Sequence, residues 1–195
     1  MKLLKLLLSF LLALSVFLAL NTKIDPLPPL GKFLSPNQGI WLNDVSEDNT
    51  EELSIKGLSA PVKVHYDKHL IPHVFAQNNL DLYRSQGYIT AKHRLWQMEF
   101  QTHASAGRLS EIVGSAALDY DRSQRRKGML FGAEKALENM QKDPEILGYL
   151  EAYRDGINSY IEPLSPSKYP VEYKLLDYAP EPWTLKKTAL LLMYM

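Results

Sequence analysis

The stretch Leu80–Gly114, LDLYRSQGYITAKHRLWQMEFQTHASAGRLSEIVG, decides how the rest of the chain must pack. Asn78, Asn79 or Asp81 can accept the free amide hydrogens of a first helical turn, and Gly107 can close the far end. The stretch therefore predicts one helix of about 25 residues.

The apolar residues of this helix fall on two stripes at about 100° per residue. One stripe contains Tyr88, Ala91, Leu95 and Met98, and the other contains Ile89, Trp96 and Phe100. Lys92 and Glu99 lie between the stripes, whereas His93, Gln97 and Gln101 cluster on the face expected to meet water. A helix with two apolar stripes packs on two sides, so we expect it at the centre of a larger body.

Glu99 needs a partner from elsewhere in the chain, because a carboxylate between apolar stripes costs several kcal/mol unless it is paired or hydrogen-bonded. Lys92 is two turns away, roughly 10 Å along the helix, which is too far for a direct bond. The candidate partners are Arg84, Arg94 and Arg108, together with segments outside the helix.

This helix and the residues just after it contain a series of short motifs: Gly87-Tyr88-Ile89, Ala91, Arg94-Leu95-Trp96-Gln97-Met98-Glu99, Ala106-Gly107-Arg108-Leu109-Ser110-Glu111 and Gly114. Together they resemble the signature of the penicillin acylase family, a group of amidases of the N-terminal-nucleophile hydrolase class. The resemblance runs with gaps from about Val62 to the last residue, and its later part includes Pro180-Glu181-Pro182-Trp183-Thr184. Lys92-His93 replace the usual Gln-Asp, a departure that concerns surface contacts.

The resemblance implies an α+β fold: a mainly helical α-chain fragment with an early β-hairpin, part of a four-layer αββα N-terminal-nucleophile hydrolase. In that family a precursor cuts itself into an α and a β chain, and the first residue of β is the nucleophile. It hydrolyses N-acyl amides, of penicillin type or acyl-homoserine-lactone type, through an acyl-enzyme. No residue of this chain is then expected to be catalytic, because the nucleophile lies beyond residue 195. No cofactor or metal ligand is expected here either, although a structural calcium is possible in the full-length protein.

Composition limits the other classes of function. The chain has 195 residues, of which 46% are hydrophobic, and its 22 basic and 22 acidic residues give no net charge. A neutral chain offers no electrostatic footprint for nucleic acid. Cysteine is absent, which excludes disulfides, zinc-thiolate sites and a cysteine nucleophile within this chain.

The first 22 residues predict a membrane anchor or a signal segment. Leu3–Leu20 would span roughly 27 Å as a helix, close to the thickness of a bilayer's hydrocarbon core. Ala13 and Ser15 have the spacing of a signal-peptide cleavage site but lie inside the apolar run, so an uncleaved anchor is favoured. Lys2 and Lys5 orient the amino terminus to the cytoplasm, which predicts an extracytoplasmic, periplasmic body tethered to the inner membrane.

Residues 23–58 read as a proline-rich spacer followed by an acidic loop. Prolines at 26, 28, 29 and 36 favour an extended spacer over a packed element. Trp41 and Leu42 could pack back on the domain or lie at the membrane interface. The acidic residues of the loop, which favour a solvated loop over a calcium site, are Glu47, Asp48, Glu51 and Glu52.

Residues 59–195 form the acylase α-chain region, which opens with a predicted hairpin of Val62–Tyr66 and Val74–Ala76. Leu70, in the connecting loop, stands where the family commonly has glycine, so we expect a strained leucine or a turn of changed shape. His65, His69 and His73 are spaced by four, but the strand alternation argues against a helical metal face. His73 is therefore expected to be structural and bonded to backbone.

Three further helices are predicted after Gly114. Asp119 or Asp121 can cap a helix running toward Met140. The resemblance implies a structural arginine in this region, so Arg125 or Arg126 is expected to reach a buried carboxylate, with Glu99 as one candidate. Asp143-Pro144 begins a helix whose apolar stripe is Ile146, Leu150, Tyr153, Ile157 and Tyr160. Thr184 caps a last helix that is still apolar at Met195, from which we expect the chain to be a fragment of a longer protein.

The sequence thus leaves two classes of function open. The first is an acylase fragment, inactive alone, that partners the β chain of its own precursor and contributes to a site for a small N-acyl amide. The second is a membrane-tethered helical binding module or a truncated, non-catalytic acylase remnant. The density of family motifs favours the first.

Overall fold

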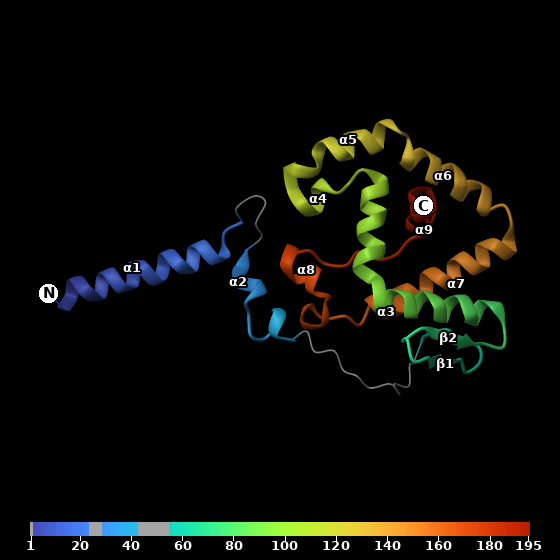
Figure 1. The fold of residues 1–195 in the computed structure, drawn as a ribbon, viewed down its shortest axis with the longest axis horizontal. Coiled ribbons are helices and arrows are strands. Elements are labelled where there is room, and N and C mark those ends of the chain that lie inside the picture. The colour runs from blue at the N-terminus through green and yellow to red at the C-terminus, as the bar shows by residue number, and fades with distance from the viewer. Residues whose placement is uncertain (1, 24–28, 43–54) are drawn as a thin grey trace.

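A computed structural model describes residues 2–23, 29–42 and 55–195 (Figure 1). The fold is mainly helical, with one two-stranded antiparallel sheet. In chain order the elements are α1 Lys2–Asn21, α2 Leu30–Phe33, η1 Ile40–Leu42, β1 Lys63–Tyr66, β2 Pro72–Phe75, α3 Asn79–Ala106, α4 Ser110–Val113, η2 Gly114–Ala117, α5 Leu118–Arg126, α6 Met129–Met140, α7 Pro144–Ile161, η3 Pro166–Lys168, α8 Val171–Leu176 and α9 Leu185–Tyr194. The predicted acidic loop at 47–52 lies outside the described residues.

Helix α3 is the centre of the fold, as its two apolar stripes predict (Figure 1). The Asn78 side chain accepts from the Asp81 amide at the start, and Gly107 ends the helix with φ of 67°. Both predicted ends are therefore confirmed. The helix bends at Arg94, where φ is −141° and ψ is 22°, and this kink was not predicted because no proline or glycine lies near Arg94.

The half of α3 before the kink packs on α7 with the two backbones almost touching. A Cβ built on Gly87 would lie 2.2 Å from the Tyr153 carbonyl oxygen, and one on Gly156 would lie 1.9 Å from the Arg84 carbonyl oxygen. Only glycine fits at such an approach. Asp143 caps α7 as predicted, and Ile157 of its stripe is fully buried, whereas Ile146 is exposed.

The main core lies where α3, α7 and the carboxyl-terminal segment meet. Its buried side chains are Ala91, Leu95, Met98, Ile157, Tyr173 and Trp183. A smaller cluster, made of Ala106, Ala133, Ala189 and Leu190, lies between the end of α3, α6 and α9. Thr184 caps α9 by accepting from the Lys187 amide, which confirms the predicted start of that helix.

The helix predicted to run from Asp119 or Asp121 to Met140 is two helices. Gly128 has φ of 72° and separates α5 from α6. Neither aspartate caps α5; instead Asp121 is buried and accepts from the Leu109 and Ser110 amides. This aspartate therefore ties α5 to the turn that follows α3, which a local capping rule does not foresee.

The predicted hairpin is confirmed, with Val64 opposite Val74 and His65 opposite His73. Leu70 has φ of 58°, so the leucine itself takes the left-handed conformation. The prediction for His73 is wrong: the ring is exposed, and its Nε2 lies 3.5 Å from Asp67 Oδ2 instead of bonding to backbone. Two backbone amides, those of His69 and Ile71, already hold Asp67 in place beside it.

The amino-terminal part begins with α1, whose 20 residues are long and apolar enough to cross a membrane, and none of that span is buried in the body. The described part of the proline-rich region, residues 29–42, is not simply extended. It forms α2 and η1 and contacts α8, because Lys174 Nζ donates to the Gly39 carbonyl at 3.2 Å. The prolines at 26 and 28 lie outside the described residues.

Candidate functional site

Glu99 lies just after the kink of α3 and is almost fully buried, yet both of its carboxylate oxygens are hydrogen-bonded. Oε2 accepts from the Tyr173 hydroxyl at 2.5 Å. Oε1 accepts from the Glu181 amide at 2.9 Å and from Lys187 Nζ at 3.1 Å. The prediction of an outside partner is confirmed, but the predicted arginines are wrong, because the cation is the ammonium of Lys187.

The arginines bond elsewhere. Arg125 Nε donates to the Gly107 carbonyl at 2.9 Å, and Arg125 is among the groups that lower the pKa of the buried Asp121. Arg84 lies at the other end of α3, where its Nη2 is 3.6 Å from Asp155 Oδ2. The side-chain bond of Arg125 therefore goes to a backbone carbonyl, and the expectation that it reaches Glu99 is wrong.

Lys187 joins the buried carboxylate to a second one. Its Nζ lies 3.0 Å from Glu181 Oε2, and Glu181 Oε1 accepts from Arg108 Nη2 at 3.0 Å. Arg108 also forms a bidentate ion pair with the Glu111 carboxylate at the start of α4. We call Glu99, Lys187, Glu181 and Arg108 the charge network. It alternates acid and base from the middle of α3 to the protein surface.

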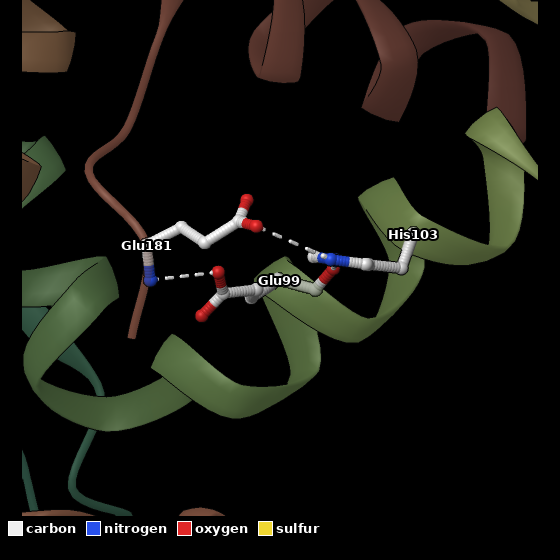
Figure 2. Close-up of side chains that lie close together, drawn as sticks. All are labelled: Glu99, His103 and Glu181. Carbon is white, nitrogen blue, oxygen red and sulfur yellow. Dashed lines mark hydrogen bonds and ion pairs between the residues drawn. The ribbon is translucent and has the colours of Figure 1, made fainter. Parts of the chain in front are cut away.

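His103 lies one turn after Glu99 and borders the charge network (Figure 2). Its Nδ1 is 3.0 Å from the Glu99 carbonyl oxygen, and because a carbonyl only accepts, Nδ1 carries the hydrogen. Its Nε2 is 3.3 Å from the Tyr178 hydroxyl and 3.7 Å from Glu181 Oε1. In the neutral ring, Nε2 therefore accepts a hydrogen bond from Tyr178.

The surroundings of Glu181 and Tyr173 hold each side chain in one protonation state near neutral pH. Burial alone would raise the pKa of Glu181, but hydrogen bonds from Arg108 and Lys187 outweigh burial and lower the pKa to about 2. Burial and the neighbouring Glu99 carboxylate raise the pKa of the Tyr173 hydroxyl far above its usual range. Neither group is suited to exchange a proton near neutral pH.

Among the described residues, one group of side chains is close enough to share a metal ion: Glu99, His103 and Glu181, with ligand atoms within 4.8 Å of one another. Lys187 argues against such an ion, since its ammonium lies about 3 Å from an oxygen of each carboxylate and already supplies the compensating charge. His103 Nδ1 is engaged by backbone as well. The donor set fits a structural network better than a metal centre.

The network fixes the segment before α9. Glu99 holds the Glu181 amide, while Asn158 of α7 pairs with the backbone of Trp183: it accepts from the amide at 2.7 Å and donates to the carbonyl at 3.0 Å. The Trp183 indole donates to Thr188 of α9 at 2.9 Å. Residues 181–183 are therefore bonded to α3, α7 and α9 at once.

A cavity of about 400 Å³ opens beside the network, lined in part by Thr102, Arg108, Glu181 and Leu190. Among these described side chains no nucleophile is paired with a base. Sequence reasoning missed Lys187, Tyr178 and His103. Only His103 had a local signal, because it follows Glu99 by four residues and so shares its helix face.

Comparisons with known proteins give consistent results. The family model described as penicillin amidase matches residues 61–195. "Penicillin acylase 2 proenzyme" of Pseudomonas sp. (strain SE83) is 41% identical over 67% of this chain, and "Acyl-homoserine lactone acylase QuiP" of Pseudomonas aeruginosa is 30% identical over 77%. These alignments cover only 16% and 18% of the two relatives, so the chain matches less than a fifth of their length.

A solved structure also resembles this chain. The thermostable penicillin G acylase from Alcaligenes faecalis in tetragonal form aligns with a TM-score of 0.60 and 28% sequence identity. The alignment covers 67% of this chain and 69% of that chain. The similarity therefore includes the three-dimensional arrangement as well as the sequence.

Proposed function

Because the chain belongs to the penicillin amidase family and matches its amino-terminal region, we propose that it is the amino-terminal part of a self-processing amidohydrolase. The whole enzyme would hydrolyse the amide bond of small N-acyl compounds, of penicillin type or acyl-homoserine-lactone type. The observation that carries the proposal is the family match across residues 61–195.

The proposed reaction uses a nucleophile outside this chain. The precursor cuts itself, and the new first residue of the β chain attacks the amide carbonyl, with its own α-amine as the base. The tetrahedral oxyanion is stabilised by hydrogen-bond donors, the amine leaves, and water hydrolyses the acyl-enzyme. The word "proenzyme" in the name of the 41% identical relative supports processing.

A separate α chain is supported by a contrast in coverage. Each alignment covers 67% of this chain, which corresponds to 69% of the solved Alcaligenes chain but only 16% of the Pseudomonas proenzyme. The solved chain is therefore much shorter than the precursor, as expected if the mature enzyme has two chains. We propose the β chain of the same precursor as the partner of this chain, and the four-layer αββα fold as the product of their assembly.

The role proposed for this chain is structural. The charge network holds residues 181–183 against α3, and this segment leads directly into α9. A misplacement of about 1 Å in supporting structure can cost a large factor in rate. Glu99 and Lys187 would thus support the site through α9 without touching substrate, and the acyl group would be selected by residues outside this chain.

The proposed location is the periplasm, with α1 as an anchor in the inner membrane. α1 has the length and composition of a membrane span, and Lys2 and Lys5 precede or open its apolar run. A structural calcium in the full-length protein would need ligands outside the charge network, because Lys187 already neutralises that network.

The first test is to sequence the coding DNA beyond the codon for Met195 and to express the complete frame. We expect several hundred further codons, two chains after purification, and a serine, threonine or cysteine as the first residue of the larger one. A stop codon directly after Met195 would contradict the proposal and favour a truncated remnant or a membrane-tethered binding module.

The second test is a chimera in which residues 61–195 replace the aligned segment of the Pseudomonas penicillin acylase 2 proenzyme. We expect self-cleavage and hydrolysis of a chromogenic N-acyl anilide, and no hydrolysis by the 195-residue chain alone. The control chimera carries Lys187→Met, which should fold poorly and leave the precursor uncut. Hydrolysis by the isolated chain would refute the assignment of the nucleophile to β.

A further inference from the structure

Residues 29–42 carry an apolar patch on the outside of the protein. Trp41 is 70% exposed, and four aliphatic side chains of the same segment are also exposed. We define the apolar patch as Leu30, Leu34, Ile40, Trp41 and Leu42. Scattered exposed leucines are ordinary, but five large apolar residues within 13 positions, one of them tryptophan, call for a partner.

The segment begins at the end of the membrane-length helix. A Cβ built on Gly31 would lie 2.8 Å from Asn21 Oδ1 and 3.2 Å from the Leu20 carbonyl oxygen, so α2 packs directly on the last turn of α1 (Figure 1). The 20 residues of α1 rise about 30 Å, the thickness of the hydrocarbon core. With α1 inserted, Asn21 and α2 therefore lie at the level of the lipid headgroups.

The segment is also attached to the body. Lys174 of α8 donates to the Gly39 carbonyl, and Lys32 Nζ lies 2.8 Å from Asp177 Oδ1. Gly39 is buried, and a Cβ there would lie 2.2 Å from the Phe33 carbonyl oxygen, so the turn around it is tight. The end of α1 and the end of α8 are thus joined through a short folded segment.

The chemistry of the patch matches a bilayer interface. Tryptophan and tyrosine are enriched at headgroup level because their rings are apolar at one side and polar at the other. The Trp41 indole donates to the Leu34 carbonyl at 3.2 Å, so its polar atom is already bonded within the segment. Lys23, just after α1, adds a positive charge at this level, whereas Lys32 is paired with Asp177.

We propose that the apolar patch lies in the headgroup region of the bilayer that α1 crosses, and that it turns α8 toward the membrane. This inference rests on the proposed anchor. The occupant is a lipid surface, because the patch follows a membrane-length helix directly in space. The body is then held at the membrane in one orientation through residues 29–42.

Site-directed spin labelling tests the proposal, since the chain contains no native cysteine. Nitroxide labels are placed one at a time at Leu12→Cys in α1, at Leu42→Cys in the patch, and at Gln141→Cys, an exposed position between α6 and α7. The intact chain is reconstituted in vesicles of phosphatidylethanolamine and phosphatidylglycerol. Collisions with oxygen, which dissolves in lipid, are compared with collisions with a water-soluble nickel chelate.

We expect the label at 12 to be accessible to oxygen and not to nickel, and the label at 141 to be accessible to nickel. The label at 42 should show several-fold lower nickel accessibility than the label at 141. Adding Trp41→Ser should raise the nickel accessibility at 42, because the patch loses its largest apolar side chain.

The outcomes separate this inference from the anchor on which it rests. If the label at 12 lies in lipid but the label at 42 is as accessible to nickel as the label at 141, the interfacial patch is overturned and the anchor stands. Nickel accessibility at both 12 and 42 overturns the anchor and the patch together.

Discussion

Both halves of α3 pack on apolar neighbours, but their closest contacts differ: before Arg94 the backbone of α3 lies against that of α7, and after Arg94 a buried ion pair joins α3 to α9. In the first half, Gly87 and Gly156 bring the backbones of α3 and α7 into contact. In the second half, Glu99 and Lys187 bond α3 to the segment around α9. The first arrangement tolerates no added volume, and the second tolerates no lost partner, so the two halves should respond to different substitutions.

The largest expected effect is on the charged half. Lys187→Met should lower the free energy of unfolding by about 3–5 kcal/mol, because it leaves the Glu99 carboxylate buried without its cation. The change is measured by urea unfolding of the parent chain and each variant in the same mild detergent. The matched control is Lys186→Met, whose exposed ammonium is 3.7 Å from Glu134 and should be worth less than about 1 kcal/mol.

The double variant Glu99→Gln with Lys187→Met sharpens this prediction. Glutamine keeps an oxygen that accepts from the Glu181 amide but carries no charge, so part of the lost stability should return. If Lys187→Met and Lys186→Met unfold at the same urea concentration, the charge network does not hold the second half.

The next effect is on the packed half. Gly156→Ala should destabilise the chain by about 1–3 kcal/mol, because the new methyl would lie 1.9 Å from the Arg84 carbonyl oxygen and would force the helices apart. Gly148→Ala, in the same helix, is the control. Its methyl would lie 3.7 Å from Leu80 Cδ2, an ordinary contact, and alanine should add up to about 1 kcal/mol of helix stability. Equal effects of the two substitutions would contradict close packing as the cause.

A smaller, pH-dependent effect is expected at the start of the packed half. Asp81 accepts from Ser59, Ala60 and Asn78; burial alone would raise its pKa, but these bonds lower the pKa to about 2. Asp81→Asn should cost about 1–2 kcal/mol at neutral pH. Because the pKa of Asp81 is depressed in the folded chain, the stability difference between the parent chain and Asp81→Asn is greatest above about pH 4. It is lost as the pH falls through about 2.

Urea unfolding of the parent chain and of Asp81→Asn across this pH range measures the prediction. Asp119→Asn is the control, because that side chain is 94% exposed and pairs with the exposed Arg122 one turn further along α5. A stability difference for Asp81→Asn that is independent of pH would exclude the carboxylate charge as its source.

The smallest effect is at the hairpin that leads into α3. Leu70→Gly should stabilise the chain by up to about 1 kcal/mol, because glycine takes φ of 58° without the steric cost that leucine has there. Lys68→Gly, in the same loop at negative φ, should destabilise it slightly, since glycine gains freedom in the unfolded chain. Thermal unfolding of both variants measures the difference, and a loss of stability in Leu70→Gly would show that the leucine side chain matters more than its backbone.

The sequence predicted what is local in this fold and missed what is distant. The caps at Asn78, Asp143 and Thr184 follow from the side chains beside them, and the hairpin follows from alternation over a few residues. Lys187 is 88 positions from Glu99, and no periodicity within a helix relates the two. Asp121 shows the same limit, because its partners at 109 and 110 are in another element.

The same distance sets an order of events during synthesis. Glu99 leaves the ribosome long before Tyr173, Glu181 and Lys187, the residues that satisfy it. At a translation rate of about 5–20 residues per second, this gap lasts roughly 4–18 s. Burying the Glu99 carboxylate during that interval would cost several kcal/mol, so we expect the second half of α3 to stay in contact with water until α9 has been made.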